Sequence, residues 1–243
     1  MNLKDTILAL SCIAFTLQSS AQNDADIVTP YRNGSSYIDP APNGFEPVYI
    51  EFEEATSEAQ ANTKLAGFSE VYFSGAEINE ILKDSKAVGI RFYNAYEPDL
   101  KDFTIVAVAI KEDGSEISSG ASQKYLISTI SDKTESHWKG YARTCVELCR
   151  DHKDMKHYAA FFSKSVIEDM LKESGDGIKL IPASRKFELK DKSVKTYNTM
   201  MAVGASISKG SIQVAGTAYR KSLEPCPYHC PTDDYLLAPA EYE

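Results

Sequence analysis

Two stretches of the chain match each other: residues 72–95 read YFSGAEINEILKDSKAVGIRFYNA, and residues 161–183 read FFSKSVIEDMLKESGDGIKLIPA. Identical residues recur in the same order through both stretches: Phe73 and Phe162, Ile78 and Ile167, Leu82 and Leu171, Gly89 and Gly177. Further along, FTIVAVAIKEDGSEI (103–117) corresponds to NTMMAVGASISKGSI (198–212). A fixed order of several matching features indicates an internal repeat, so the sequence predicts two tandem copies of one α/β unit.

Each copy opens with the pattern of a short amphipathic helix. Ser74 and Glu77 form a capping box, which satisfies free amides at a helix start, and Ser163 offers the same cap without the Glu. The same three positions are apolar in both copies, at i, i+3 and i+4: Ile78, Ile81 and Leu82, then Ile167, Met170 and Leu171. Gly89 and Gly177 are predicted to end the helices in the left-handed conformation.

An antiparallel meander is predicted after each helix. Residues 103–110 are apolar on both alternating faces, which is typical of a strand covered on both sides. The expected strands are 90–95, 103–110 and 122–130 in the first copy, and 196–207 and 211–219 in the second. Asp113-Gly114 and Lys209-Gly210 are tight-turn signals between strands. A further short helix is expected before each unit, at 54–64 and 150–158.

The fold class predicted from these patterns is α+β. Two tandem homologous units each pack a short helix or two on an antiparallel β-meander. The expected boundaries are a signal peptide (1–21), a flexible leader (22–45), repeat unit 1 (46–149), repeat unit 2 (150–235) and a tail (236–243). The leader is assigned because it is rich in Asn, Asp, Ser, Pro and Gly and has no sustained apolar period.

The N-terminus indicates export. Lys4 precedes an apolar run at 7–17, and Ser19 and Ala21 are the small residues that a signal peptidase accepts, so cleavage is expected after Ala21. The apolar run is too short to span a hydrocarbon core of roughly 30 Å, which argues against a membrane anchor. Processing as a lipoprotein at Cys12 is the other alternative. We therefore expect an exported soluble protein, periplasmic or extracellular.

The charge of the chain limits its partners. The formal net charge is −9. An acidic surface disfavours nucleic acid and anionic membranes, which attract clustered Lys and Arg. An unknown protein or a small-molecule ligand is the expected partner. No motif for a cofactor or for nucleophilic hydrolysis is present, so no cofactor is expected and an enzymatic role is disfavoured.

The cysteines of the mature chain are Cys145, Cys149, Cys226 and Cys230. An even number in an exported chain predicts disulfides. Because each copy brings one Cys-x-x-x-Cys pair, the local pairings Cys145–Cys149 and Cys226–Cys230 are favoured over a cross-link between copies.

Two chemical alternatives remain open for these cysteines. Cys145, Cys149 and His152 have zinc-type ligands but fit no standard zinc spacing. Cys226 and Cys230, with His229 between them, could instead form the dithiol of a thiol oxidoreductase, although three intervening residues are unusual. A hydrolase with unrecognised carboxylates is the remaining enzyme alternative.

The combined pattern resembles a group of small uncharacterised exported proteins of the Bacteroidetes. Its features are a helix, Gly-Ile-Arg-Phe-Tyr (89–93), an apolar strand, Asp-Gly and a terminal Cys-Pro-x-x-Cys. The resemblance covers roughly 70–130 and 158–231, as two copies instead of one, and Val146 departs from it where Pro would stand. It implies fold and export but no activity. We therefore expect a binding or structural module of the cell envelope or exterior, with any ligand between the copies.

Overall fold

The computed structural model describes residues 27–30, 48–112, 115–117, 125–127, 135–151, 159–174, 176–189, 192 and 194–222. The expected signal peptide and tail, the Asp113-Gly114 turn, and Cys226 and Cys230 lie outside these ranges. The described residues form an α+β fold with antiparallel sheets, which confirms the predicted class. No helix within these ranges is long and apolar enough to cross a membrane.

The elements follow one another in a similar order in the two halves of the chain. After β1 (Ile27–Pro30) and β2 (Val48–Ile50), the first half contains α1 (Phe52–Ala66), β3 (Val71–Ser74), α2 (Gly75–Ile81), β4 (Gly89–Glu97), β5 (Asp102–Ile110) and β6 (Tyr125–Ile127). The second half contains α3 (Glu135–Asp151), β7 (Ala159–Ser163), α4 (Lys164–Ser174), β8 (Gly177–Leu189), β9 (Val194–Ser208), β10 (Ser211–Val214) and β11 (Tyr219–Lys221).

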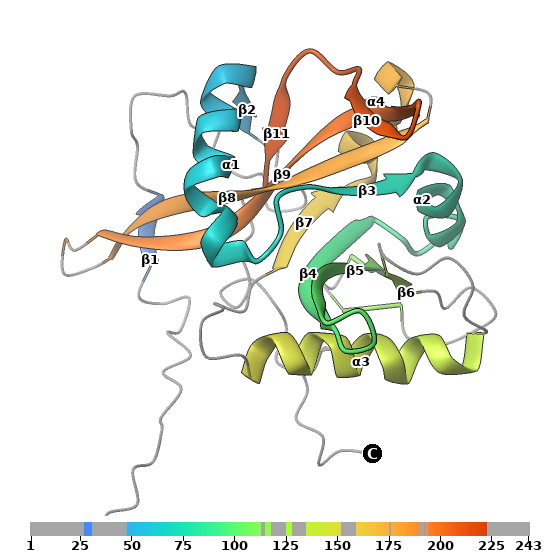
Figure 1. Cartoon of the computed structure of the whole chain (residues 1–243). Helices are drawn as coiled ribbons and strands as arrows, with labels where there is room; N and C mark the ends of the chain where they lie inside the picture. Colours follow the sequence, from blue (N-terminus) through green and yellow to red (C-terminus); the bar gives the residue numbers. More distant parts are fainter. Residues whose placement is uncertain are drawn as a thin grey trace, which may run out of the picture.

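Two sheets share strands from both halves. The smaller sheet has the order β6-β5-β4-β7, so its edge strand β7 comes from the second half. The larger sheet follows β1-β8-β9-β11-β2, with β10 on β9 and the first-half strand β3 on β8. Figure 1 shows β3 beside β8, and β7 reaching toward β4. Each half therefore contributes one strand to the sheet of the other.

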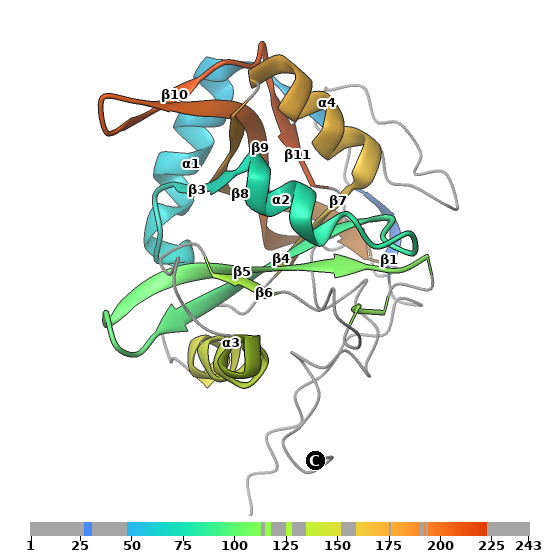
Figure 2. The same ribbon diagram turned by 90° about the vertical axis from the view of Figure 1, so that its right-hand side faces the viewer.

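A central core fills the space between the two sheets. It contains the apolar stripe of α2 (Ile78, Ile81, Leu82) and the buried stripe residues of α4 (Ile167, Met170). Figure 2 shows α3 on the far side of the smaller sheet, away from the larger sheet. A second core lies under α3 and a third lies under α1. Because both faces of β5 are covered, residues 104–110 are all buried, as the two-sided apolar pattern predicted.

Local signals placed several elements correctly. Ser74 caps α2 in a complete capping box, in which the Glu77 carboxylate accepts from the Ser74 N–H at 3.0 Å. The cap at Ser163 is weaker, because its Oγ accepts from the Val166 N–H at 3.5 Å. Lys209 and Gly210 both have positive φ, 53° and 77°, and join β9 to β10 as the predicted tight turn.

The two predicted helix-ending glycines have a different role. Gly89 and Gly177 begin β4 and β8, and neither has positive φ; of the described glycines, only Gly67 and Gly210 do. A Cβ on Gly89 would lie 2.4 Å from the Phe162 carbonyl oxygen, and a Cβ on Gly177 would lie 2.3 Å from the Phe73 carbonyl oxygen. Glycine is required here because the neighbouring strand approaches closely.

The helix expected at 150–158 lies earlier in the chain. α3 spans Glu135–Asp151, so the predicted boundary between units, 149/150, falls inside a continuous helix. Ala142, Cys145, Val146 and Cys149 form its buried stripe, at i, i+3, i+4 and i+7. This period was missed because the two cysteines were interpreted as a disulfide pair. The structure also places β1 inside the expected flexible leader, where it pairs with β8.

Candidate functional site

The described cysteines are buried in the core under α3. Cys145 and Cys149 are both fully buried and are free thiols, so the favoured Cys145–Cys149 disulfide is not formed in this structure. Successive turns of a helix hold the two Cα atoms about 6 Å apart, at the wide end of disulfide geometry. They precede β7, whereas Cys226 and Cys230 follow β11, so the two pairs do not hold equivalent positions in the element order.

The environment of these thiols also disfavours thiol chemistry. Burial raises the pKa of Cys149 from 9.0 to about 12. Because the thiolate is the reactive form and the metal ligand, Cys149 is poorly suited to redox or zinc chemistry at neutral pH. Within the described ranges, no group of His, Cys, Asp and Glu side chains is arranged to hold a metal ion. The redox alternative at Cys226 and Cys230 stays a prediction.

A buried carboxylate joins α3 to the end of β4. Glu97 is fully buried, and its Oε2 lies 3.9 Å from the Cys145 Sγ. Its Oε1 accepts hydrogen bonds from the Tyr141 hydroxyl and from the Asp99 N–H, the latter at 3.2 Å. The Tyr141 hydroxyl also lies 3.0 Å from Asp99 Oδ2. All these partners belong to the protein, so the arrangement is a structural connection between helix and sheet.

A second polar network lies inside the smaller sheet. Arg91 Nη1 donates to the Tyr93 hydroxyl at 3.3 Å, and that hydroxyl donates to Glu116 Oε1 at 2.8 Å. The Tyr125 hydroxyl lies 3.5 Å from Glu116 Oε2. None of these four residues is more than 3% exposed. A network closed to solvent satisfies its own charges but gives a substrate no access.

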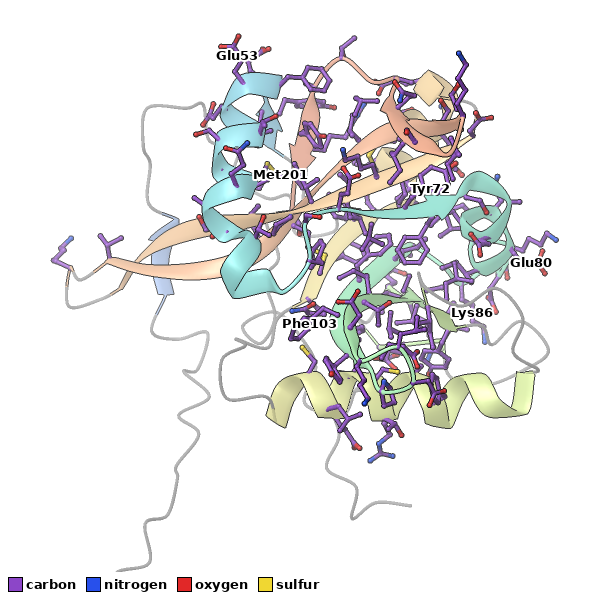
Figure 3. All side chains as sticks on the ribbon, in the orientation of Figure 1. Glu53, Tyr72, Glu80, Lys86, Phe103 and Met201 are labelled. Carbon is purple, nitrogen blue, oxygen red and sulfur yellow. The ribbon has the colours of Figure 1, made fainter. Side chains whose placement is uncertain are left out.

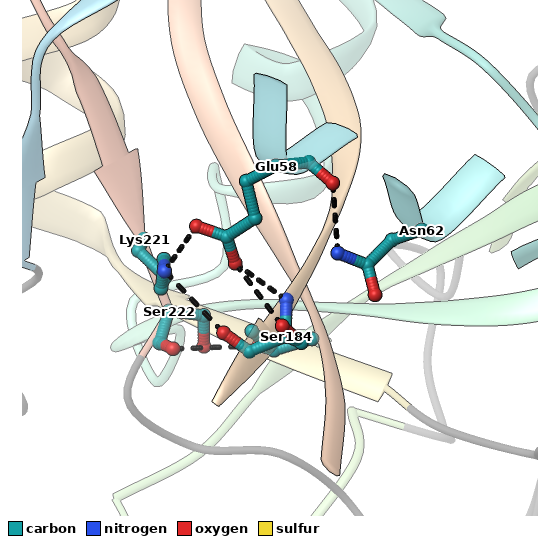
Figure 4. Close-up of polar contacts among 6 residues, drawn as sticks. Glu58, Asn62, Ser184, Lys221 and Ser222 are labelled. Atoms are coloured by element: carbon teal, nitrogen blue, oxygen red, sulfur yellow. Dashed lines mark hydrogen bonds and ion pairs between the residues drawn. The ribbon is translucent and has the colours of Figure 1, made fainter. Parts of the chain in front are cut away.

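Glu58 of α1 forms a polar cluster on the larger sheet (Figure 4). Its carboxylate accepts from the Ser184 N–H at 2.7 Å and from Lys221 Nζ at 2.5 Å, while the Ser184 hydroxyl is more distant at 3.4 Å. On this edge of β8, the described strands β3 and β1 pair only with residues on either side of 181–186. Glu58 therefore satisfies a sheet-edge amide and does not activate the Ser184 hydroxyl as a nucleophile.

An ion pair fixes α4 to β11. The Arg220 guanidinium donates to both carboxylate oxygens of Glu173, at 2.6 and 3.1 Å, and Arg220 is 4% exposed. The Tyr49 ring lies over it, 5.4 Å from the guanidinium carbon. Bidentate pairing with a carboxylate orients a planar guanidinium strongly. This is a further structural contact between distant segments.

The described residues do form one open pocket with an apolar lining. It has a volume of about 480 Å³ and lies where three segments meet: the loop after α1 with the start of β3, the start of β5, and the β9–β10 hairpin. Figure 2 shows these three segments along one side of the molecule. Its apolar and aromatic lining residues are Phe68, Val71, Tyr72, Phe103, Ile207 and Ile212. Pockets of this size accept small organic ligands.

Packing around Gly67 shapes the pocket wall. Gly67 ends α1 with φ 76°, and its N–H donates to the Thr63 carbonyl at 2.9 Å. A Cβ at this position would lie 2.4 Å from the Phe103 ring, so the ring rests directly against the glycine. Tyr72 and Phe103 come from the two strands β3 and β5, and both are labelled in Figure 3. Ile207 is 56% exposed and leaves the pocket open to solvent.

Two carboxylates accompany the apolar lining. Glu70 Oε2 lies 2.5 Å from Lys179 Nζ, so its charge is compensated. Asp102 accepts one printed hydrogen bond, from the Phe103 N–H to Oδ1 at 2.8 Å, and its side chain is exposed. The pocket residues were missed by sequence reasoning because they belong to three distant turns and form no motif. The only available signal was the expectation that a ligand would lie between the two halves.

Comparison of the chain with models of known protein families, with curated proteins and with solved structures gave no match. Function is therefore inferred from the geometry of the described residues alone.

Proposed function

We propose that the protein is an exported binding module built from two tandem homologous units, and that its ligand occupies the pocket at their junction. The observation that carries the proposal is the composition of that pocket. Residues 67–72 and 102–103 come from the first half of the chain, while Ile207 and Ile212 come from the second. A single unit would lack part of this lining.

The element order supports the tandem units. Both halves run helix, strand, helix and then a meander, so we assign the units to 52–127 and 135–221. Positions matched in the sequence also have matching surroundings: Phe73 and Phe162, and Ile78 and Ile167, are all buried in the central core. The exchange of β3 and β7 between sheets interlocks the units. Interlocking holds the pocket walls in a fixed relation.

The chemistry of the lining supports binding over catalysis. Among its described lining residues, the pocket has no His, Cys, Lys or Arg. Catalytic sites usually combine a nucleophile or general base with a group that orients it. The polar clusters outside the pocket connect helices to strands and are already satisfied by protein partners. The apolar N-terminal run with small residues up to Ala21, and the resemblance to exported proteins of the Bacteroidetes, support export.

Methyl NMR on isoleucine-labelled mature protein tests the proposed site. Phenylpropanol, a neutral probe with an apolar body, is added up to about 1 mM, where weak binding is still detectable. We expect shifts of the Ile207 and Ile212 methyl signals, while the fully buried Ile105 stays unchanged.

The Ile207→Asp variant should lose the response, because a carboxylate in the lining disfavours apolar contact. Ile207 is exposed, so this variant is expected to fold. Absence of any shift at Ile207 and Ile212, or a larger shift at methyls outside the pocket, would overturn the proposed site.

A further inference from the structure

We propose that the pocket is specific for an organic cation with an apolar body, such as an apolar amine, and that Asp102 is the residue that recognises its charge. This inference rests on the proposed function and names the ligand class for the same pocket. It combines three observations: the charge balance of the lining, the placement of Asp102, and the aromatic walls.

The charge balance of the lining is negative. Glu70 and Asp102 are the charged groups among the described lining residues. Lys179 compensates Glu70 at 2.5 Å, which leaves Asp102 as the net charge. Lys101 and Lys209 are near in sequence but do not line the pocket. A lining with net negative charge attracts cations and repels anions.

Asp102 is positioned to contact a ligand. It is the first residue of β5, and its only printed hydrogen bond, from the Phe103 N–H, engages Oδ1. No described residue is given a contact with Oδ2, so this oxygen can accept a hydrogen bond from an ammonium group. Phe103, the next residue, places an aromatic ring beside that carboxylate in the same lining.

The aromatic walls favour a cation over a neutral ligand. Phe103 and Tyr72 both line the pocket. A cation near an aromatic face gains electrostatic attraction from the ring quadrupole. Burial raises the pKa of Tyr72, and the carboxylates of Asp176 and Glu77 raise it further, so the local potential is negative at this wall as well. The apolar side chains Ile207 and Ile212 would contact the body of the same ligand.

Three probes with one apolar body separate charge from apolar binding. Phenylpropylamine, phenylpropanol and phenylbutyrate share a phenylpropyl group and end in an ammonium, a hydroxyl and a carboxylate. Each is titrated against the full-length mature protein while the Ile207 and Ile212 methyl signals are followed. We expect the amine to bind about fivefold more tightly than the alcohol, and the carboxylate to bind most weakly. Added salt should reduce the preference for the amine.

Asp102→Asn removes the charge with little change in shape. We expect this variant to lose most of the amine preference while keeping its affinity for phenylpropanol. Asp84→Asn is the matched control, because Asp84 also accepts from a nearby backbone N–H, that of Lys86, and does not line the pocket. The control should keep the full preference.

The outcomes distinguish the two proposals. If no probe shifts the pocket methyls, the proposed function fails and this inference fails with it. Equal binding of amine and alcohol, or tighter binding of phenylbutyrate, overturns the cation specificity and leaves the binding module intact. An amine preference that survives in Asp102→Asn overturns the assignment of Asp102.

Discussion

The two halves of the chain agree in the central core and differ on the outer faces of their sheets. Toward the central core, Phe73 and Phe162 occupy matching positions on the exchanged strands β3 and β7. On the outer faces, α1 covers its sheet with an ionic contact at Glu58, which lies partly exposed. α3 covers its sheet with the fully buried Glu97 and with Cys145.

This difference shows which contacts the common pattern requires. The central core is shared by both halves, so a change on one side must be accommodated by the other, and volume is tightly constrained. Each outer face packs against a single helix, so it can be rebuilt independently. The features unique to one half, such as the thiols of α3, therefore lie on the outer faces. The predictions below test this contrast.

The largest effect is expected in the central core. Ile78 and Ile167 are both fully buried there. Ile78→Ala and Ile167→Ala should each lower the free energy of unfolding by about 3–4 kcal/mol, because each leaves a cavity that close-packed neighbours cannot fill. Urea unfolding measures both. Ile207→Ala, at a 56% exposed position, is the control and should change stability by less than about 0.5 kcal/mol. Unequal effects of Ile78→Ala and Ile167→Ala would break the equivalence of the two halves.

The next effect concerns the paired glycines at the starts of β4 and β8. Gly89→Ala and Gly177→Ala should each cost about 2–3 kcal/mol, because the added Cβ would meet a backbone carbonyl that cannot rotate away. Gly140→Ala is the control: nothing lies within 4 Å of its added Cβ, and alanine is the better helix former by about 1 kcal/mol. Thermal melting should therefore move in opposite directions. A harmless Gly177→Ala would contradict the close strand approach.

The sequence predicted those features whose signals are local. The capping box of Ser74, the Lys209-Gly210 turn and the apolar period of α2 each lie within a few residues, so their patterns could be interpreted without tertiary structure. The helix α3 was misplaced because Cys145 and Cys149 also fit a second interpretation, as a disulfide. Residue type alone does not separate a buried thiol from a bonded one.

The exchanged strands and the pocket could not be predicted. β3 and β7 are short apolar strands that fit either sheet, so only the complete packing selects their partners. Glu58 and Lys221 are separated by 163 residues, and nothing local relates them. The pocket combines turns from three distant segments. Contacts of this kind depend on tertiary structure, whereas the predicted motifs depend on the backbone nearby.

The outer faces differ in their response to pH. Burial raises the pKa of Cys149 to about 12, so above pH 9 the unfolded chain loses a thiol proton that the folded chain keeps. This contribution is fully present below pH 9 and is lost as the pH rises toward 12. Its slope is about 1.4 kcal/mol per pH unit. Urea unfolding in reductant should show a shallower decline for Cys149→Ala than for the natural protein.

Asn62→Ala is the matched control for this experiment. Asn62 is also buried on a covering helix, α1, where its side chain donates to the Glu58 carbonyl oxygen at 2.8 Å. The variant should lower stability by a similar amount at every pH, because the amide does not titrate. A decline above pH 9 that is identical in Cys149→Ala and the natural protein would show that the thiol does not contribute.

The smallest effect separates the starts of α2 and α4. Ser74→Ala should cost about 1 kcal/mol, since it removes the Oγ that accepts from the Glu77 N–H and receives support from the Glu77 carboxylate. Ser163→Ala should cost only a few tenths of a kcal/mol, because its Oγ is 3.5 Å from the Val166 N–H and no Glu completes the box. Chemical unfolding of both variants measures the difference. If Ser163→Ala were as costly as Ser74→Ala, the two helix starts would be equivalent in energy, and the carboxylate of Glu77 could not be what distinguishes them.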